Sequence, residues 1–158
     1  MKRRVYLIRH AHAGDRTRWA GDDSQRPLSE KGWRHARGLA DLLRGVPLKR
    51  VLSSPSLRCV QTVEPLAEAH GLPVEIAGEL LEGSDPGATL DFLDRVSTET
   101  GGPIAACTHG DIVPGILDLL RSAGASVDGV LTWPKASAWV LDGDGRGFTH
   151  ARYIPPPG

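Results

Sequence analysis

Four side chains that could bind and transfer a phosphoryl group lie in three separate parts of the sequence. Arg9 and His10 are adjacent near the N-terminus, whereas Arg58 and His109 come much later. Guanidinium groups match phosphoryl oxygens bidentately, which a lysine ammonium does not. A neutral imidazole can attack phosphorus in line and carry the phosphoryl group as a phosphohistidine. These residue types therefore favour phosphoryl chemistry, on condition that the fold brings them together.

The elements expected around these groups place them at one edge of a sheet. Short apolar runs predict buried strands at residues 4–8, 50–53 and 104–108. Arg58 falls in the first turn of a helix expected to begin with Ser54 as N-cap and Pro55 as N1. Ligands bind outside the carboxyl ends of parallel strands, where helix N-termini favour anions. The four side chains are therefore expected to form one dianion site.

The remaining pattern predicts the fold class. Helices are expected from Ser29, over 89–96 and from Asp111, and a weaker strand over 73–76. Later strands are expected at 130–133, 136–141 and 147–154, with a hairpin turn at 142–147. Strand–helix alternation followed by a hairpin indicates an α/β three-layer sandwich. Its central sheet is expected to be mostly parallel with an antiparallel edge, and to carry helices on both faces.

Length and charge limit the possible architectures and partners. The chain of 158 residues suits one domain over 1–158, with a frayed Pro-rich tail at 155–158. A (β/α)8 barrel needs about 250 residues and is excluded. Because 19 basic residues balance 19 acidic ones, no nucleic-acid or membrane partner is expected. No apolar stretch suits a signal peptide or a membrane span, which favours a cytoplasmic location. With no exposed apolar stripe evident, a monomer is expected.

Four blocks of the sequence resemble the histidine phosphatase superfamily in order and spacing. They are LIRHA at 7–11, LSEKG at 28–32, SSPSLRCVQT at 53–62 and THGD at 108–111. The small size, the LIRHA start and GSDP at 83–86 resemble the SixA-type phosphohistidine phosphatases more than the larger phosphoglycerate mutases. They also resemble the small phosphatase domains that accompany Nudix domains in actinobacteria, although no Nudix domain is expected here.

The resemblance implies a role for each of the four side chains. His10 would be the nucleophile, with its second ring nitrogen held by an acceptor, expected to be a backbone carbonyl in the following loop. Arg9 and Arg58 would bind the phosphoryl oxygens, and a protonated His109 would donate to an equatorial oxygen. The same chemistry requires no metal and no cofactor.

The leaving-group acid is expected after the third strand. Glu82 is the best match, with Glu79 and Asp85 behind it. An alkoxide leaves poorly without a proton, whereas imidazole leaves easily from a phosphoramidate. A Glu82 that can protonate the leaving group would therefore favour phosphate esters as substrates. A Glu82 that points away from the site would favour phosphohistidine.

The expected function is a metal-independent phosphatase acting on protein phosphohistidine. Two alternatives stay open: a small-molecule phosphomonoesterase, or a non-catalytic phosphate-binding module that keeps Arg9 and Arg58. His12 is expected near the pocket mouth, and the spacing supplies no third ligand for a metal. In the 11–27 loop, Arg16, Arg18 and Trp19 are expected either to steer a substrate or to form a mobile lid. Cys59 and Cys107 are expected to be buried, reduced thiols, since neither begins a cysteine-phosphatase motif.

Overall fold

The computed structural model describes residues 2–158. In chain order the elements are β1 (Arg3–Arg9), η1 (Arg16–Arg18), η2 (Asp23–Gln25), α1 (Glu30–Leu42), β2 (Arg50–Ser53), α2 (Leu57–Ala69), β3 (Val74–Ile76), η3 (Gly78–Leu80), α3 (Pro86–Thr100), β4 (Ile104–Thr108), α4 (Ile112–Ser122), β5 (Ser126–Asp128), β6 (Ala138–Asp144) and β7 (Gly147–Ile154). Among these residues, the helices are too short or too polar to cross a bilayer.

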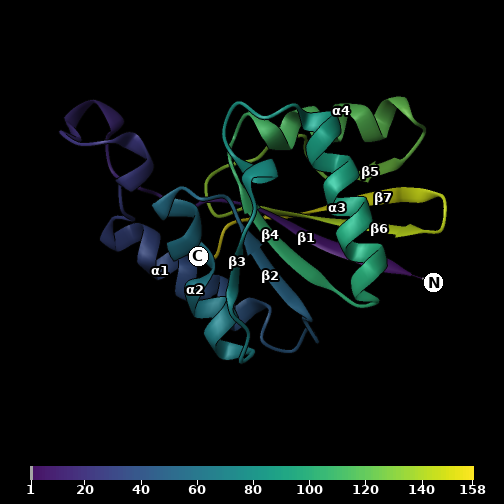
Figure 1. Cartoon of the computed structure of the whole chain (residues 1–158), viewed down its shortest axis with the longest axis horizontal. Helices are drawn as coiled ribbons and strands as arrows, with labels where there is room; N and C mark the ends of the chain where they lie inside the picture. The colour runs from purple at the N-terminus through teal and green to yellow at the C-terminus, as the bar shows by residue number, and fades with distance from the viewer. Residues whose placement is uncertain (1) are drawn as a thin grey trace.

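The strands form a single mixed sheet in the order β3-β2-β4-β1-β6-β7-β5 (Figure 1). Strands β1, β2, β3 and β4 run parallel, and β6 runs antiparallel to both β1 and β7. The α/β class, the mostly parallel sheet and the antiparallel part are therefore confirmed. Arg9 pairs with Thr108, and Ser53 pairs with Cys107. The carboxyl ends of β1, β2 and β4 consequently meet at one edge.

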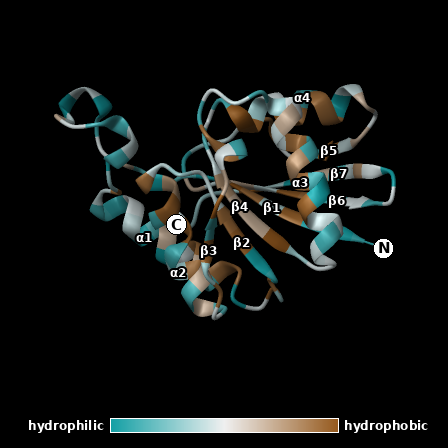
Figure 2. Cartoon of the chain, in the orientation of Figure 1, coloured by the Kyte–Doolittle hydropathy of each residue, from teal (hydrophilic) through white to brown (hydrophobic). Residues whose placement is uncertain are grey.

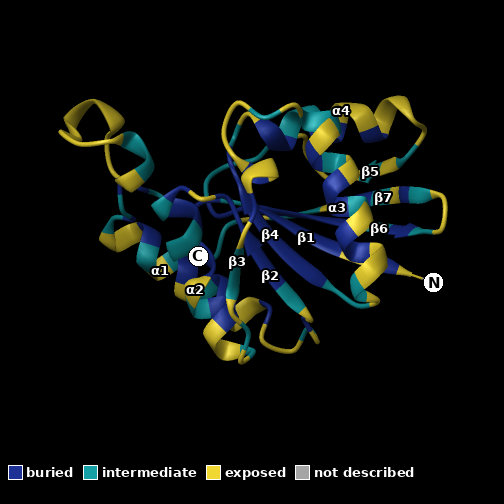
Figure 3. Ribbon diagram, viewed as in Figure 1, coloured by how far each residue is buried: buried dark blue, intermediate teal, exposed yellow. Residues whose placement is uncertain are grey.

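Alternating side chains of the central strands build one apolar core on each face of the sheet. Tyr6 and Ile8 of β1 face the core that contains α1 and α2, whereas Val5 and Leu7 face the core that contains α3 and α4. The central strands β1 and β4 are accordingly among the most buried ribbons in Figure 3, and apolar residues follow both strands in Figure 2. The three layers fix the strand ends, and therefore the positions of the side chains that follow them.

The prediction of a strand over 130–133 is wrong. The short strand lies earlier, at β5, and residues 130–133 form an irregular segment with Val130 and Leu131 exposed. Carbonyl groups of this segment bind side chains instead of a neighbouring strand. Trp139 Nε1 donates to the Thr132 carbonyl at 3.0 Å, and Arg9 Nη1 donates to the Trp133 carbonyl at 2.9 Å.

The second helix begins later than predicted. Its N-cap is Ser56, not Ser54, and its first residue is Leu57. Ser54 Oγ is instead 2.9 Å from His109 Nε2 and accepts from the Ser56 amide at 3.3 Å. The Ser54 hydroxyl therefore supports a turn and a site histidine. Arg58 still falls in the first turn of the helix, as expected.

The Pro-rich tail is not simply frayed. A Cβ added at Gly38 of α1 would lie 2.5 Å from Pro157 Cβ, so the tail packs closely on that helix. The C-terminus accordingly lies beside α1 and α2 in Figure 1. Ile154, just before the tail, packs against the core of the same face.

Candidate active site

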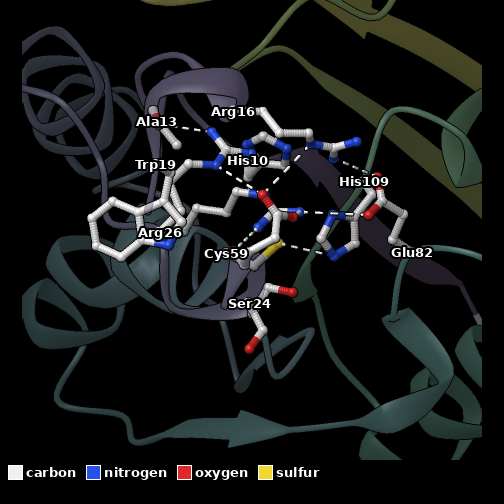
Figure 4. Close-up of polar contacts among 12 residues, drawn as sticks. His10, Ala13, Arg16, Trp19, Ser24, Arg26, Cys59, Glu82 and His109 are labelled. Carbon is white, nitrogen blue, oxygen red and sulfur yellow. Dashed lines mark hydrogen bonds and ion pairs between the residues drawn. The ribbon is translucent and has the colours of Figure 1, made fainter. Parts of the chain in front are cut away.

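The structure brings the four predicted side chains to one edge of the sheet. His10 follows β1 and His109 follows β4, and their ring centroids are 5.5 Å apart in an edge-on arrangement (Figure 4). Arg9 and Arg58 are close enough to His10 to disfavour its positive charge. A cavity of about 610 Å³ opens here, lined by His10, Arg9 and several further charged side chains.

His10 is held as a neutral imidazole with one nitrogen fixed. Its Nδ1 is 2.8 Å from the Ala11 carbonyl, which can only accept, so Nδ1 carries the proton and Nε2 keeps its lone pair. Burial lowers the pKa of His10 to about 3, and the charges of His109, Arg58 and Arg9 act in the same direction, against the bond to Ala11. The expected backbone acceptor is thus confirmed and is the next residue in the chain. His10 has the protonation state that a nucleophile needs.

Arg9 is positioned by two segments remote in sequence. Its Nη1 donates to the Trp133 carbonyl at 2.9 Å, while its Nε is buried without a partner among the described residues. Burial lowers the pKa of Arg9, an effect that Asp111 partly offsets. A Cβ at Gly110 would lie 2.6 Å from Arg9 Cζ. The glycine of the THGD block therefore leaves room for the guanidinium.

Arg58 is almost fully buried, with 1% of its surface exposed. Nη1 donates to the Asp23 carbonyl at 2.9 Å, and Nη2 lies 3.3 Å from Asp23 Oδ2 and 3.7 Å from Glu82 Oε2. Its Nε is buried and unpaired within residues 2–158. The guanidinium is thus rigidly placed beside the histidines.

His109 is anchored through one nitrogen and leaves the other unpaired. Nε2 is 2.9 Å from Ser54 Oγ and 3.5 Å from Cys59 Sγ, whereas Nδ1 is buried without a partner in the described chain. Such orphaned buried nitrogens are uncommon in folded proteins. In the part of the chain that the structure describes, four buried side-chain nitrogens are unpaired, and three belong to Arg9, Arg58 and His109.

Among the three acidic candidates, Glu82 lines the cavity. Arg16 Nη2 donates to Glu82 Oε1 at 3.1 Å (Figure 4), and Glu82 Oε2 lies 3.7 Å from Arg58 Nη2. Asp85 instead caps α3 by accepting from the Ala88 amide at 3.2 Å. Neither Asp85 nor Glu79 lines the cavity.

His12 lies at the cavity wall, where the sequence predicts it. Its Nδ1 is 2.7 Å from Ser29 Oγ, the hydroxyl that also caps α1 by accepting from the Gly32 amide. Within residues 2–158, no group of three or more His, Cys, Asp or Glu side chains is arranged to hold a metal ion. Cys59 and Cys107 are both buried free thiols, as expected.

Five charged residues at or beside the cavity were not predicted. Asp23 reaches Arg58 from η2, and the cavity is also lined by Arg26, Lys135, Asp15 and Asp111. Burial lowers the pKa of Lys135, and repulsion from Arg9 and neighbouring arginines adds to this effect. The dense mixture of charges in the 11–27 stretch was the available signal for Arg26 and Asp23. Lys135 carries no such signal, because it lies between the strands expected at 130–133 and 136–141.

Parallel strand ends, buried cations and a neutral histidine meet at this site. Residues 5–86 match the histidine phosphatase superfamily (branch 1). The chain belongs to this superfamily, and the resemblance seen in the four sequence blocks is confirmed.

Individual relatives include proteins with different named substrates. The chain is 30% identical to an 8-oxo-(d)GTP phosphatase of Mycolicibacterium smegmatis, with 97% of the chain and 48% of that protein aligned. It is 34% identical over 113 residues to the phosphohistidine phosphatase SixA of Escherichia coli, covering 69% of the chain and 68% of SixA. The chain thus spans about half the length of the mycobacterial relative.

Solved structures give the same picture of the fold. A protein histidine phosphatase SixA complexed with tungstate superposes with a TM-score of 0.77 at 25% identity, covering 98% of this chain and 96% of that one. A phosphoglycerate mutase from Bacillus anthracis superposes with a TM-score of 0.76 at 18% identity, over 94% of this chain and 91% of the mutase. The latter likeness concerns the fold alone.

Proposed function

We propose that the chain is a phosphatase that works through a phosphohistidine formed on His10. The observation that carries the proposal is the neutral His10, with Nδ1 fixed on the Ala11 carbonyl, beside unpaired buried nitrogens of Arg9, Arg58 and His109. A phosphoryl group offers oxygen acceptors to all three. The proposal therefore gives a partner to polar atoms that the protein itself leaves unsatisfied.

In the first step, His10 Nε2 attacks phosphorus. The N–P bond forms as the bond from phosphorus to the leaving atom breaks, and the leaving group takes up a proton. In the second step, water attacks the phosphohistidine, its proton passes to a base or to solvent, and phosphate and neutral His10 are released. The arginines and His109 stabilise the charge on the equatorial oxygens through both steps. Each charge-assisted hydrogen bond contributes about 1.5–3 kcal/mol, so several are needed.

The geometry favours a phosphate ester as the first substrate class. Glu82 lines the cavity, so its carboxyl lies where it could reach the leaving oxygen of a bound ester. The name of the mycobacterial relative is consistent with a nucleotide as one such ester, although this chain aligns with only 48% of that protein. A small phosphate ester, nucleotides included, is therefore the substrate we test first.

Protein phosphohistidine is the second candidate substrate. The similarity to SixA in both sequence and structure favours it. An imidazole leaving group needs no strong acid, so this reaction would proceed without help from Glu82. The two substrate classes thus differ in their dependence on one carboxylate.

The chemistry is tested by turnover of p-nitrophenyl phosphate in EDTA, with the His10→Ala variant beside the wild type. We expect full wild-type activity in EDTA and a loss of at least about a thousandfold in the variant, because the nucleophile is removed. Activity that depends on a metal, or that survives the substitution, would refute the proposal. Phosphate binding with no turnover of any substrate would indicate the non-catalytic module.

The substrate class is tested with Glu82→Gln. On nucleoside monophosphates and sugar phosphates we expect kcat to fall about a hundredfold, the usual contribution of a general acid. On a phosphohistidine-bearing protein we expect kcat to be unchanged. A wild type that turns over only the protein substrate, with no effect of the substitution, would assign the SixA-like role.

A further inference from the structure

We infer that Asp23 is a specificity residue that occupies Arg58 and that the phosphoryl group of a substrate must displace. The inference rests on the proposed function, since it takes Arg58 as a phosphoryl-binding group. Asp23 belongs to η2, in the 11–27 segment between β1 and α1. This segment is the exposed excursion at the left of Figures 1 and 3.

Both terminal nitrogens of Arg58 are bound to Asp23. Nη1 donates to its carbonyl at 2.9 Å, and Nη2 lies 3.3 Å from its Oδ2. With 1% of its surface exposed, the guanidinium has no free outward face. Arg58 is accordingly absent from the cavity lining, although Arg9 and His10 are part of it. Arg58 Nε is unpaired, so an anion that reaches His10 can form a bidentate contact through Nε and Nη2 once Asp23 Oδ2 leaves Nη2.

Asp23 has a second set of partners that would remain after displacement. Its Oδ1 accepts from Arg26 Nε at 3.0 Å and lies 3.5 Å from Arg16 Nε. Arg26 is fixed in turn by donating to the Ala13 carbonyl at 2.7 Å (Figure 4). The Asp23 carboxylate therefore links Arg58 of α2 to two arginines of its own segment, Arg16 and Arg26. Releasing Oδ2 from Arg58 leaves the charge of Asp23 paired.

This arrangement discriminates between anions by charge. A buried guanidinium that loses a carboxylate must gain an equally good partner, because an unpaired buried charge is strongly destabilising. A monoanion only replaces one negative charge with another. A phosphate dianion brings additional charge and further oxygens for Arg9 and His109. Asp23 should therefore admit phosphomonoester dianions and reject singly charged anions such as phosphodiesters.

The test compares the wild type with Asp23→Asn and Asp23→Ala. We expect inorganic phosphate to bind Asp23→Asn about tenfold more tightly, equivalent to about 1.4 kcal/mol, by inhibition and calorimetry. Dimethyl phosphate, a monoanion that should not displace Asp23 measurably in the wild type, should inhibit Asp23→Asn. Asp22→Asn is the matched control. It makes the same change on the neighbouring residue, but its carboxylate accepts from the Ser24 amide, does not contact Arg58 and should leave phosphate affinity unchanged.

A second measurement reports the displacement in the wild-type protein. Trp19 Nε1 donates to the carbonyl of Asp22, the residue before Asp23, at 2.9 Å, and 39% of the Trp19 surface is exposed. Saturating phosphate should therefore change Trp19 emission, and Trp19→Phe should abolish that change. Phosphate affinity that is unchanged or weaker in folded Asp23→Asn, or phosphate binding without a change in Trp19 emission, would overturn the inference. An active His10→Ala variant would instead refute the proposed function.

Discussion

At the scale of single residues, the neutral state of His10 makes protein stability depend on pH. An unfolded histidine takes up a proton near pH 6.5, whereas folded His10 has a pKa of about 3. Between these values the unfolded state binds more protons than the folded state. Stability therefore falls as pH decreases below 6.5, and it is unaffected by this group at higher pH.

We predict that His10→Gln flattens the pH dependence of stability. Each pH unit below 6.5 costs the wild type up to about 1.4 kcal/mol through His10, so at about pH 5 its contribution is about 2 kcal/mol. Urea unfolding of both proteins at neutral and mildly acidic pH measures the difference, since the other histidines contribute equally to both curves. Parallel curves would show that His10 titrates normally in the folded protein.

At the scale of elements, the loop between β4 and α4 makes the arginine site possible. A Cβ at Gly110 would lie 2.6 Å from Cζ and 2.7 Å from Nη2 of Arg9. The atoms that would have to move belong to the end of a flexible side chain. A substitution there should disturb Arg9 before it disturbs the fold.

We predict that Gly110→Ala raises KM roughly tenfold, the effect of losing one charge-assisted contact, and changes unfolding free energy by less than about 1 kcal/mol. Steady-state kinetics and urea unfolding measure the two quantities. Gly45→Ala, which has no neighbour within 4 Å, is the matched control. If Gly110→Ala leaves KM unchanged, Arg9 does not bind the substrate where the structure places it.

The start of α1 is set by a close approach of two backbone segments. A Cβ at Gly32 would lie 2.1 Å from the His12 carbonyl oxygen, which also accepts from the Ser29 amide. This contact explains why the LSEKG block ends in glycine, beyond the N-cap role of Ser29.

We predict that Gly32→Ala destabilises the protein by about 1–3 kcal/mol, because backbone must shift to admit the methyl group. Chemical denaturation measures this cost. Wild-type stability of the variant would mean that α1 and the His12 segment are further apart than described.

Prediction from the sequence succeeded where local patterns decide the structure. The strands 50–53 and 104–108 were located correctly because each is an apolar run with polar or turn residues beside it. The prediction of a strand over 130–133 failed because apolar residues of this segment are exposed to solvent. Its carbonyl groups accept hydrogen bonds from the side chains of Arg9 and Trp139 instead of from a neighbouring strand. Tertiary contacts, which a local pattern does not encode, decided that segment.

The residues of the candidate site also fall into a group that could be predicted from the sequence and a group that could not. Groups at strand ends and helix starts were identified from the sequence, since topology alone brings them together. Asp23, Arg26 and Lys135 were not, because their positions depend on the path of irregular segments. Sequence reasoning could find the charge of these residues but not their contacts.

At the scale of the whole molecule, we propose that residues 1–158 form one cooperative domain. The two cores share the strands β1, β4 and β6, with alternate residues of each strand on opposite faces. Neither face can lose its helices without exposing strands that also support the other face.

We predict a single unfolding transition. Near-UV circular dichroism, which reports the buried Trp139, should coincide with far-UV circular dichroism, which reports the helices. Separate transitions for the two signals would show that the two faces unfold independently.

The central claim is that a cationic site holds a phosphoryl group for capture by His10. The most direct measurement is mass spectrometry of the enzyme quenched in alkali during turnover, since phosphohistidine survives alkali. We predict that the peptide containing His10 gains one phosphoryl group, that the group maps to His10 and that the His10→Ala variant carries none. A phosphoryl group on another residue, or turnover with no phosphorylated enzyme in the wild type under single-turnover conditions, would contradict the account.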